Sequence, residues 1–313
     1  MSRVRLAAVD IGTNSTRLLV ADVTDGQVAE EQARDMVITR LGRGVDATRR
    51  FDPASLARTL EVVGGYADRC RALGVEAVRV VATSATRDVR NREELVDGVR
   101  ARTGVEPEVL SGDQEAAATW AGATAGLPGA ERTLVVDIGG GSTEFIAGVP
   151  GRPPEAMLSL DVGCVRLTER HLRGDPPAPA EVAAMRADVR AHLARLAGVL
   201  DPAAASRVVG VAGTVTTVVA LCLGLPAYDP RAIHHATVGA GQVEATAARL
   251  LALTVAERAA LPVMAKGRED VIAAGAVVLD EVCRSFGFDR IMASETDILD
   301  GVLLGLAART VSR

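Results

Sequence analysis

The apolar residues of this chain follow two patterns, one typical of strands and the other typical of helices. Continuous apolar runs of strand length occupy 4–10 and 16–23, with the polar stretch DIGTNS between them. A run, a turn and a second run predict a β-hairpin over 4–23, followed by a third strand near 28–38. Apolar residues at helical spacing across 53–74 predict a helix that ends at a glycine.

The rest of the first half continues this alternation. The pattern predicts a strand over 75–85 and a helix over 91–104, for which Asn91 is the candidate N-cap. In 105–126 we expect a short strand, a turn and a helix that begins near Gln114. Strands that alternate with helices are typical of α/β domains.

At residue 132 the pattern restarts. The segment 132–149 is again a strand, a glycine turn and a strand, and its DIGGGST matches the earlier DIGTNST at five of seven positions. Similarity at so long a spacing indicates duplicated domains rather than a solenoid. A length of 313 residues also favours two domains.

The second half adds two further predicted strands, at 158–163 and 207–213. Apolar patterning predicts helices over residues 181–200, 214–225, 243–253, 268–287 and 297–309. The large helices among them would cover the sheet of the second half.

Composition and charge narrow the classes of partner. The net charge is −5 and Lys266 is the only lysine, so the general basic surface of a nucleic-acid binder is not expected. The four cysteines form no CxxC pair, which argues against a zinc site or a disulfide framework. No leader and no run of about 18 apolar residues is present, so we expect a cytoplasmic protein without a membrane partner.

The glycine turns carry the first candidate chemistry. A glycine turn between strands exposes consecutive backbone N–H groups that an anion can approach closely. A single such turn would be read as a tight hairpin only; the repeated pair, with GVAGT (210–214) as a third turn, favours phosphate binding. The candidate phosphate-binding residues in the turns are Thr13, Asn14, Ser15, Gly139, Gly140, Gly141, Ser142, Thr143, Gly213 and Thr214.

Carboxylates and arginines supply the second group of candidate functional residues. Asp10 and Asp137 end apolar strands, where a buried carboxylate needs a partner such as a divalent cation. Glu115 lies just inside a helix start; it could activate a water, or it could merely stabilise the helix N-terminus. Arg87, in a loop predicted between a strand and a helix, could hold phosphate oxygens. The adjacent His234 and His235 lack spaced partners and make a poor metal site.

Several segments together resemble the exopolyphosphatase/guanosine-pentaphosphate phosphohydrolase family of the actin-like superfamily. The resemblance runs through DIGTNSTRLL, TRLGRGVD, ATSATRDVRN, SGDQEA, VDIGGGSTE, VGCVRLTER, GVAGTVTT and REDVIAAGA. The paired DIG motifs alone would indicate only the superfamily. The arginine-bearing segments are more specific for the family.

The resemblance implies an α/β fold of two ribonuclease-H-like, actin-like domains flanking an interdomain cleft. We expect the first domain at 1–118, with a C-terminal helix at about 296–313 packing back on it, and the second at 119–295. It implies that Glu115 is the catalytic carboxylate and that Asp137 and Glu144, with Asp10, bind Mg²⁺, or Mn²⁺ in its place. It also implies that Arg87 and Asn91 contact phosphate.

The activity implied is hydrolysis of the terminal phosphoanhydride of inorganic polyphosphate. The alternatives left open are a guanosine pentaphosphate 5′-phosphohydrolase, which would link the protein to the stringent response, and a non-catalytic sensor of polyphosphate or guanosine penta- or tetraphosphate. The chain looks like a short form of the family, so short polymers are the expected substrates, and a homodimer is the expected assembly. One departure is Asp300, where many members have an arginine.

Overall fold

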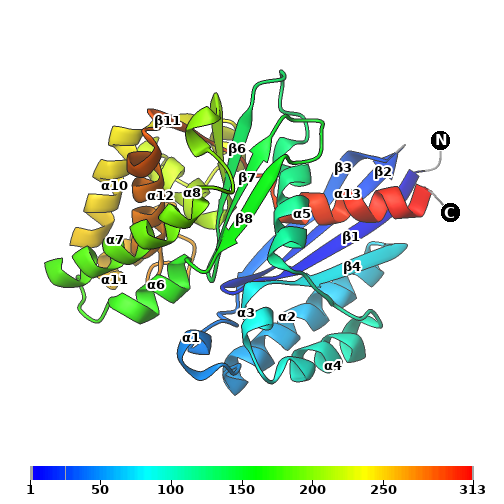
Figure 1. Cartoon of the computed structure of the whole chain (residues 1–313). Coiled ribbons are helices and arrows are strands. Elements are labelled where there is room, and N and C mark those ends of the chain that lie inside the picture. Colours follow the sequence, from blue (N-terminus) through cyan, green and yellow to red (C-terminus); the bar gives the residue numbers. More distant parts are fainter. Residues whose placement is uncertain (1–2, 25, 312–313) are drawn as a thin grey trace. The chain divides into compact units, whose positions relative to one another are not determined.

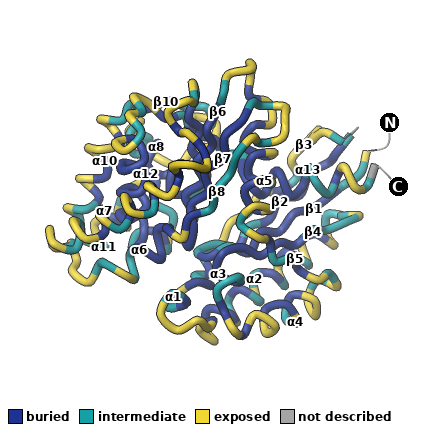
Figure 2. The backbone as a smooth tube through the Cα atoms, viewed as in Figure 1, coloured by how far each residue is buried: buried dark blue, intermediate teal, exposed yellow. Residues whose placement is uncertain are grey.

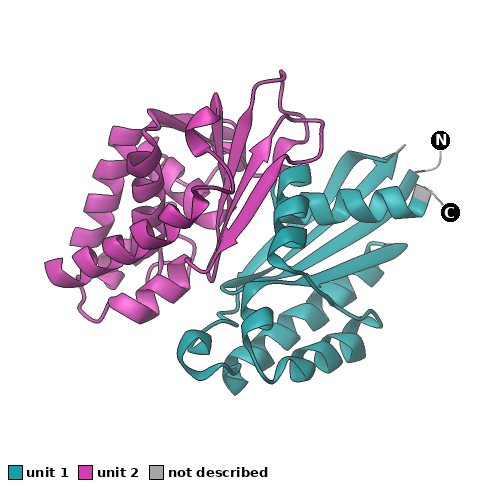
Figure 3. Cartoon of the chain, viewed as in Figure 1, with its two compact units in different colours: residues 1–122, 297–313 teal, residues 123–296 magenta. Residues whose placement is uncertain are grey.

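The structure, a computed structural model, describes residues 3–24 and 26–311. It divides into two compact units, 1–122 with 297–313, and 123–296 (Figure 3). From the sequence we expect the corresponding boundaries after 118 and after 295. The last two residues of the predicted C-terminal segment lie outside the described residues.

The first unit is one five-stranded sheet with helices on both faces (Figure 1). Its strands are β1 (Arg3–Ile11), β2 (Ser15–Thr24), β3 (Gln27–Ile38), β4 (Ala77–Ala82) and β5 (Glu108–Val109). Its helices are α1 (Val45–Thr48), α2 (Pro53–Ala72), α3 (Ser84–Asp88), α4 (Arg92–Thr103), α5 (Gly112–Thr124) and α13 (Ile298–Val311).

The second unit has a six-stranded sheet. Its strands are β6 (Thr133–Ile138), β7 (Thr143–Gly148), β8 (Ala156–Leu160), β9 (Arg207–Val211), β10 (Thr237–Gly239) and β11 (Arg290–Ala293). Its helices are α6 (Cys164–His171), α7 (Pro179–Leu193), α8 (Ala212–Cys222), α9 (Pro230–Ile233), α10 (Ala240–Ala252), α11 (Val255–Ala259) and α12 (Ile272–Phe286), with single 3₁₀ turns at 194–196 and 202–204.

The two sheets repeat one topology. The first has the order β3-β2-β1-β4-β5, and the second has β8-β7-β6-β9-β11 with β10 added at its edge. In each sheet the first three strands are antiparallel. The first strand of the hairpin, β1 or β6, also pairs in parallel with the strand on its other side, β4 or β9. The predicted α/β class and the duplication of the opening hairpin are therefore confirmed.

Alternation along β1 and β2 decides which side chains meet which helix. Ala7, Val9 and Ile11 belong to the core under α2 and α4, whereas Leu6 and Ala8 belong to the core under α13. Because successive side chains of a strand point to opposite faces, residue 10 of β1 shares the face of α13. Figure 2 shows that these strands are buried along most of their length.

Some local predictions are wrong. The strand predicted over 75–85 ends at Ala82, and its polar end instead starts the short helix α3, which carries Arg87. Asn91 precedes α4 but makes no side-chain cap; its Oδ1 accepts the Phe51 N–H at 2.9 Å. The helix α6 and the strands β10 and β11 were not predicted at all. Among the described residues, no helix has the length and apolar character that crossing a bilayer requires.

Candidate active site: two glycine turns and their carboxylates

The repeated motif folds into the same backbone turn in both units. In the first, the Gly12 N–H donates to the Ser15 carbonyl at 2.9 Å; in the second, the Gly139 N–H donates to the Ser142 carbonyl at 3.0 Å. A Cβ at either glycine would lie 3.1 Å from that carbonyl oxygen. Glycine thus allows close backbone approach in both turns, where a side chain would be tightly packed.

The carbonyls of the first turn are held by the segment 39–42. The Asn14 carbonyl accepts the N–H groups of Thr39 and Arg40 at 3.0 and 2.9 Å, and the Thr13 carbonyl accepts that of Gly42 at 2.7 Å. Since C=O and N–H point oppositely across a peptide, the Asn14 N–H, which shares its peptide with the Thr13 carbonyl, faces away from this segment. Within the described residues, the N–H groups of Thr13 and Asn14 have no hydrogen-bond acceptor.

The carbonyls of the second turn are held by the start of α6. The Gly139 carbonyl accepts the Cys164 N–H at 3.0 Å, and the buried Arg166 donates Nε to the Gly141 carbonyl at 2.8 Å. The Gly140 carbonyl accepts the Arg166 N–H at 3.2 Å. In the part of the chain that the structure describes, the N–H groups of Gly140 and Gly141 find no acceptor, so this turn too presents donors for an anion.

The third turn joins β9 to α8. Its Ala212 has a φ of 68°, a left-handed conformation that costs energy for a residue with a Cβ. A Cβ at Gly213 would lie 2.2 Å from Nη2 of Arg268, a buried arginine whose Nη1 donates to Thr217 Oγ1 at 2.7 Å. Glycine at 213 therefore lets a guanidinium lie against the start of a helix, where anions bind favourably.

Parallel strands bring the second and third turns to the same edge of the second sheet. Asp137 of β6 pairs with Val211 of β9, so the turns that follow the two strands are neighbours. The carboxyl ends of parallel strands are where α/β sheets bind ligands. The predicted residues of 139–143 and Gly213–Thr214 are thus gathered in one place.

A pair of carboxylates lies across the second hairpin. Asp137 and Glu144 are direct cross-strand partners, and both are buried. Glu144 Oε1 accepts the Ser159 hydroxyl at 2.7 Å. Directly opposed like charges in a sheet are destabilising unless a cation or donor lies between them.

This donor set fits a divalent cation such as Mg²⁺. That ion is usually bound by one or two carboxylates together with waters and substrate phosphates, rather than by an all-protein cage. Among the described residues, no group of three or more acidic, histidine or cysteine side chains is arranged to hold a metal ion. Asp137 and Glu144 would supply the two carboxylates.

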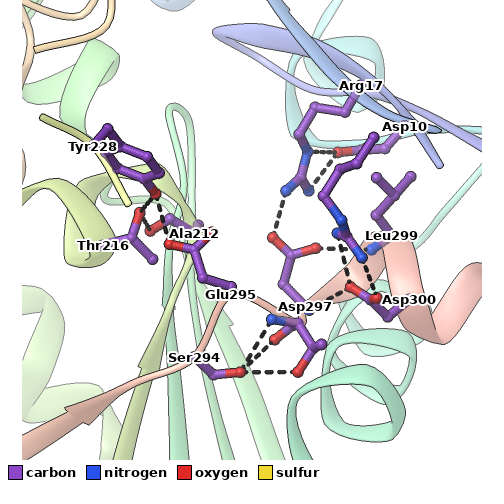
Figure 4. A network of polar contacts seen from close by, with 12 residues as sticks. Asp10, Arg17, Ala212, Thr216, Tyr228, Ser294, Glu295, Asp297, Leu299 and Asp300 are labelled. Atoms are coloured by element: carbon purple, nitrogen blue, oxygen red, sulfur yellow. Dashed lines mark hydrogen bonds and ion pairs between the residues drawn. The ribbon is translucent and has the colours of Figure 1, made fainter. Parts of the chain in front are cut away.

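The first hairpin places an arginine where the second has Glu144. Arg17 is the cross-strand partner of Asp10, and its Nε and Nη2 both donate to Asp10 Oδ2, at 3.0 and 2.8 Å. Figure 4 shows this pair, with Arg17 reaching on to Asp297. Burial raises the pKa of Asp10, and Arg17 opposes that rise. Asp10 is therefore partly neutralised by its own hairpin.

Glu115 is not the cap of its helix. Ser111 and Gln114 form a reciprocal capping pair at the start of α5, because Gln114 Oε1 accepts the Ser111 N–H and Ser111 Oγ accepts the Gln114 N–H, at 2.9 and 3.2 Å. Glu115 instead bonds Arg87 Nη1 through Oε2 at 2.5 Å. The helix-capping alternative for Glu115 is weakened, because other residues fill that role.

The electrostatics of Glu115 suit a base. Burial raises the pKa of Glu115, while the Arg87 charge and a hydrogen bond from Thr83 lower it. The nearby charge of Asp10 raises this pKa further, so the two carboxylates lie within electrostatic reach of each other. A carboxylate with a raised pKa is a stronger proton acceptor once ionised.

Not every predicted residue joins these groups. Arg87 Nη1 also donates to the Leu110 carbonyl at 3.0 Å, so part of this guanidinium is already occupied by Glu115 and by that carbonyl. Asn91 directs Oδ1 to the Phe51 N–H. The contacts of these residues give no direct support to a phosphate loop.

The second unit also contains a hollow of about 650 Å³ that holds none of the candidate residues. It is lined by Arg207 and Arg290, at the starts of β9 and β11, and by Phe286 and Phe288. These are the amino ends of parallel strands, opposite to the edge that carries the turns. Ligands of α/β sheets bind at the carboxyl ends, so we do not assign the active site to this hollow.

The prediction missed three arginines: Arg17, Arg166 and Arg268. Each is buried or mostly buried and contacts a turn or its carboxylate. The signal was present, since each lies in a segment that carries the family resemblance. What could not be read was the contact that each one makes.

Comparison with known proteins matches nearly the whole chain to one family. The model of the Ppx/GppA phosphatase family matches residues 4–310. The chain is 43% identical to exopolyphosphatase 2 of Mycobacterium tuberculosis over 98% of this chain and 100% of that protein. It is 29% identical to exopolyphosphatase 1 of the same species, over 96% of this chain and 88% of that protein.

Solved structures agree with this match. A crystal structure of an exopolyphosphatase-like protein is 35% identical, with a TM-score of 0.96 and coverage of 99% of this chain and 100% of that one. The Aquifex aeolicus member of the Ppx/GppA family is 29% identical, with a TM-score of 0.82 and 99% coverage of both chains.

Proposed function

Because the chain belongs to the Ppx/GppA phosphatase family, we propose that it is an exopolyphosphatase, which hydrolyses the terminal phosphoanhydride of inorganic polyphosphate and releases orthophosphate. The name of its 43% identical relative supports this substrate. The observation that carries the proposal is the duplicated turn: two backbone turns closed by the same hydrogen bond, each with N–H donors that lack acceptors in the described chain. Such donors suit a substrate with a repeating anionic unit.

The residues divide the work as follows. The N–H groups of the turns at 12–15 and 139–142, with Gly213 and Thr214, bind phosphate oxygens and orient the chain. Glu115 accepts a proton from the attacking water, with Arg87 fixing its side chain. Asp137 and Glu144 would hold Mg²⁺, which offsets the charge that develops on the phosphate oxygens.

We also propose that short polymers are preferred. The binding groups named above lie within a few turns, and the chain has a net charge of −5. Phosphates beyond the reach of these turns add few contacts, and the overall field mildly opposes them. Whether the assembly is a homodimer stays a prediction.

The test is orthophosphate release, with Mg²⁺, from a ladder of polyphosphates of defined length, set beside guanosine pentaphosphate and ATP. We expect kcat/KM to be highest for polyphosphate and to stop rising once the chain outgrows the turns. A higher kcat/KM for guanosine pentaphosphate would favour the nucleotide phosphohydrolase. Binding of these compounds without release of orthophosphate from any of them would favour the non-catalytic sensor.

A further inference from the structure

The residues that hold Asp10 form a continuous series of contacts within the first unit. Arg17 gives Nε and Nη2 to Asp10 and Nη1 to Asp297 Oδ2. Asp297 is the N-cap of α13, and its Oδ1 accepts the Leu299 N–H at 3.0 Å. Figure 4 shows Arg17 between the two carboxylates, one from β1 and one from the start of the C-terminal helix.

Asp300 completes this helix start. Its Oδ2 accepts the Asp297 N–H at 2.9 Å, as the third helical residue does in a capping box, and its Oδ1 accepts Nη2 of Arg34 on β3 at 2.6 Å. Asp300 thus has an ion-pair partner of its own. Both oxygens of Asp297 and both of Asp300 are occupied.

Asp10 is the exception in this series. Both contacts from Arg17 fall on Oδ2, and Oδ1 is buried without a hydrogen-bond partner among the described residues. The residue is only 4% exposed. A buried carboxylate oxygen that lacks a partner is costly, and it is a ready ligand for a cation.

Asp297 also decides how fully Arg17 neutralises Asp10. A guanidinium that served Asp10 alone would form a one-to-one ion pair and would compete with a cation for the carboxylate. Here Asp297 shares the same guanidinium, which still fixes the orientation of Asp10. Because two carboxylates face one arginine, the three groups keep a net charge of −1. The field at Oδ1 therefore stays attractive to a cation.

We propose that Asp297 is a positioning residue: acting through Arg17, it holds Asp10 with Oδ1 free and sets the affinity of that oxygen for the divalent cation that accompanies the phosphate chain. The proposal rests on the proposed function for its role in turnover, but its test does not. An outer partner that orients a metal ligand typically changes metal affinity by about 10- to 100-fold when it is replaced.

The experiment measures Mn²⁺ binding by electron paramagnetic resonance, without substrate, for the wild type, Asp297→Asn and Asp300→Asn. Asparagine at 297 still caps α13 through its amide oxygen, but it no longer offers Arg17 a charge. Asparagine at 300 is the matched control, because it removes a charge from the same helix start without touching Arg17. Thermal unfolding of all three proteins reports on the helix itself.

We expect Asp297→Asn to bind Mn²⁺ about 10-fold or more weakly, with a proportionate rise in the Mg²⁺ concentration needed for half-maximal polyphosphate hydrolysis. Asp300→Asn should bind Mn²⁺ as the wild type does, and Asp297→Glu should recover part of the affinity. Equal Mn²⁺ affinities for the wild type and Asp297→Asn, equal losses in both asparagine variants, or no Mn²⁺ binding by the wild type would overturn the proposal. Failure to hydrolyse polyphosphate with normal Mn²⁺ results would instead count against the proposed function alone.

Discussion

The two opening hairpins have the same turn but opposite electrostatics. Each has an aspartate at the end of its first strand, and the cross-strand partner lies seven residues later: Arg17 for Asp10, and Glu144 for Asp137. In the first hairpin the partner neutralises the aspartate; in the second it adds a further negative charge. The position opposite the aspartate therefore sets the local charge: a carboxylate beside an arginine in the first hairpin, and two carboxylates, which would suit a divalent cation, in the second.

The two hairpins separate two properties that the sequence motif combines. Under the proposed function, phosphate binding would depend on the turn, because its N–H groups and braced carbonyls recur in both units. The charge available to a cation would depend on the residue opposite the aspartate, which is Arg17 in the first hairpin and Glu144 in the second. The braces differ too: a loop at 39–42 holds the first turn, and the start of α6 holds the second.

The largest effect is expected outside both hairpins, at Glu115. Glu115→Gln keeps the shape of the side chain and removes the base, so kcat should fall by about 10²–10⁴-fold while polyphosphate still binds. Steady-state kinetics and a direct binding measurement check this. Glu93→Gln is the control, since it removes a first-turn acid from α4. Near-normal kcat in Glu115→Gln would return this residue to a structural role.

The electrostatic difference between the hairpins can be tested by giving the second hairpin the arginine of the first. Glu144→Arg gives Asp137 the partner that Asp10 has, so Mn²⁺ affinity should fall by at least about 10- to 100-fold. The first hairpin shows that an arginine opposite the aspartate is compatible with this fold. Glu144→Gln, the isosteric control, should lose less. Wild-type affinity in Glu144→Arg would show that the cation is held elsewhere.

The packing of α13 on α5 supports both Asp297 and Glu115. A Cβ at Gly301 would lie 1.8 Å from the Ala118 carbonyl oxygen, so Gly301→Ala should destabilise the protein by about 1–3 kcal/mol. At Gly305 of the same helix a Cβ meets only the flexible Arg79 side chain, at 3.1 Å. Gly305→Ala should therefore be neutral or stabilising by roughly 0.5–1 kcal/mol. Urea unfolding distinguishes the two, and equal effects would contradict this contact.

The smallest effect expected is on pH dependence. Arg87 lowers the pKa of Glu115, so Arg87→Gln should raise this pKa. A base must be ionised to act, and the acidic limb of kcat/KM should therefore move to higher pH, by about one unit or more. Profiles at saturating Mg²⁺ for the wild type, Arg87→Gln and the exposed control Arg90→Gln test this. An unmoved acidic limb in Arg87→Gln would contradict the role of Glu115 as the titrating base.

Much of the fold could be predicted because the strands of both hairpins are buried on both faces and read as continuous apolar runs. The helix α6 escaped prediction because it has only eight residues, and the buried Arg166 interrupts its apolar face. The residues alone left the role of Glu115 open, and only the family resemblance assigned it as the catalytic carboxylate, although the spacing of Ser111 and Gln114 was visible as a capping pair. The contact of Arg17 with Asp297 spans 280 positions, and no local pattern encodes it.

The central claim is that this protein directs water onto the terminal phosphorus of a polyphosphate chain. The most direct measurement is mass analysis of the products formed from tetrapolyphosphate and Mg²⁺ in ¹⁸O-labelled water. The account predicts orthophosphate that carries one labelled oxygen and a shortened chain that carries none. Label in the shortened chain, phosphate transferred to another acceptor, or no release at all would contradict it.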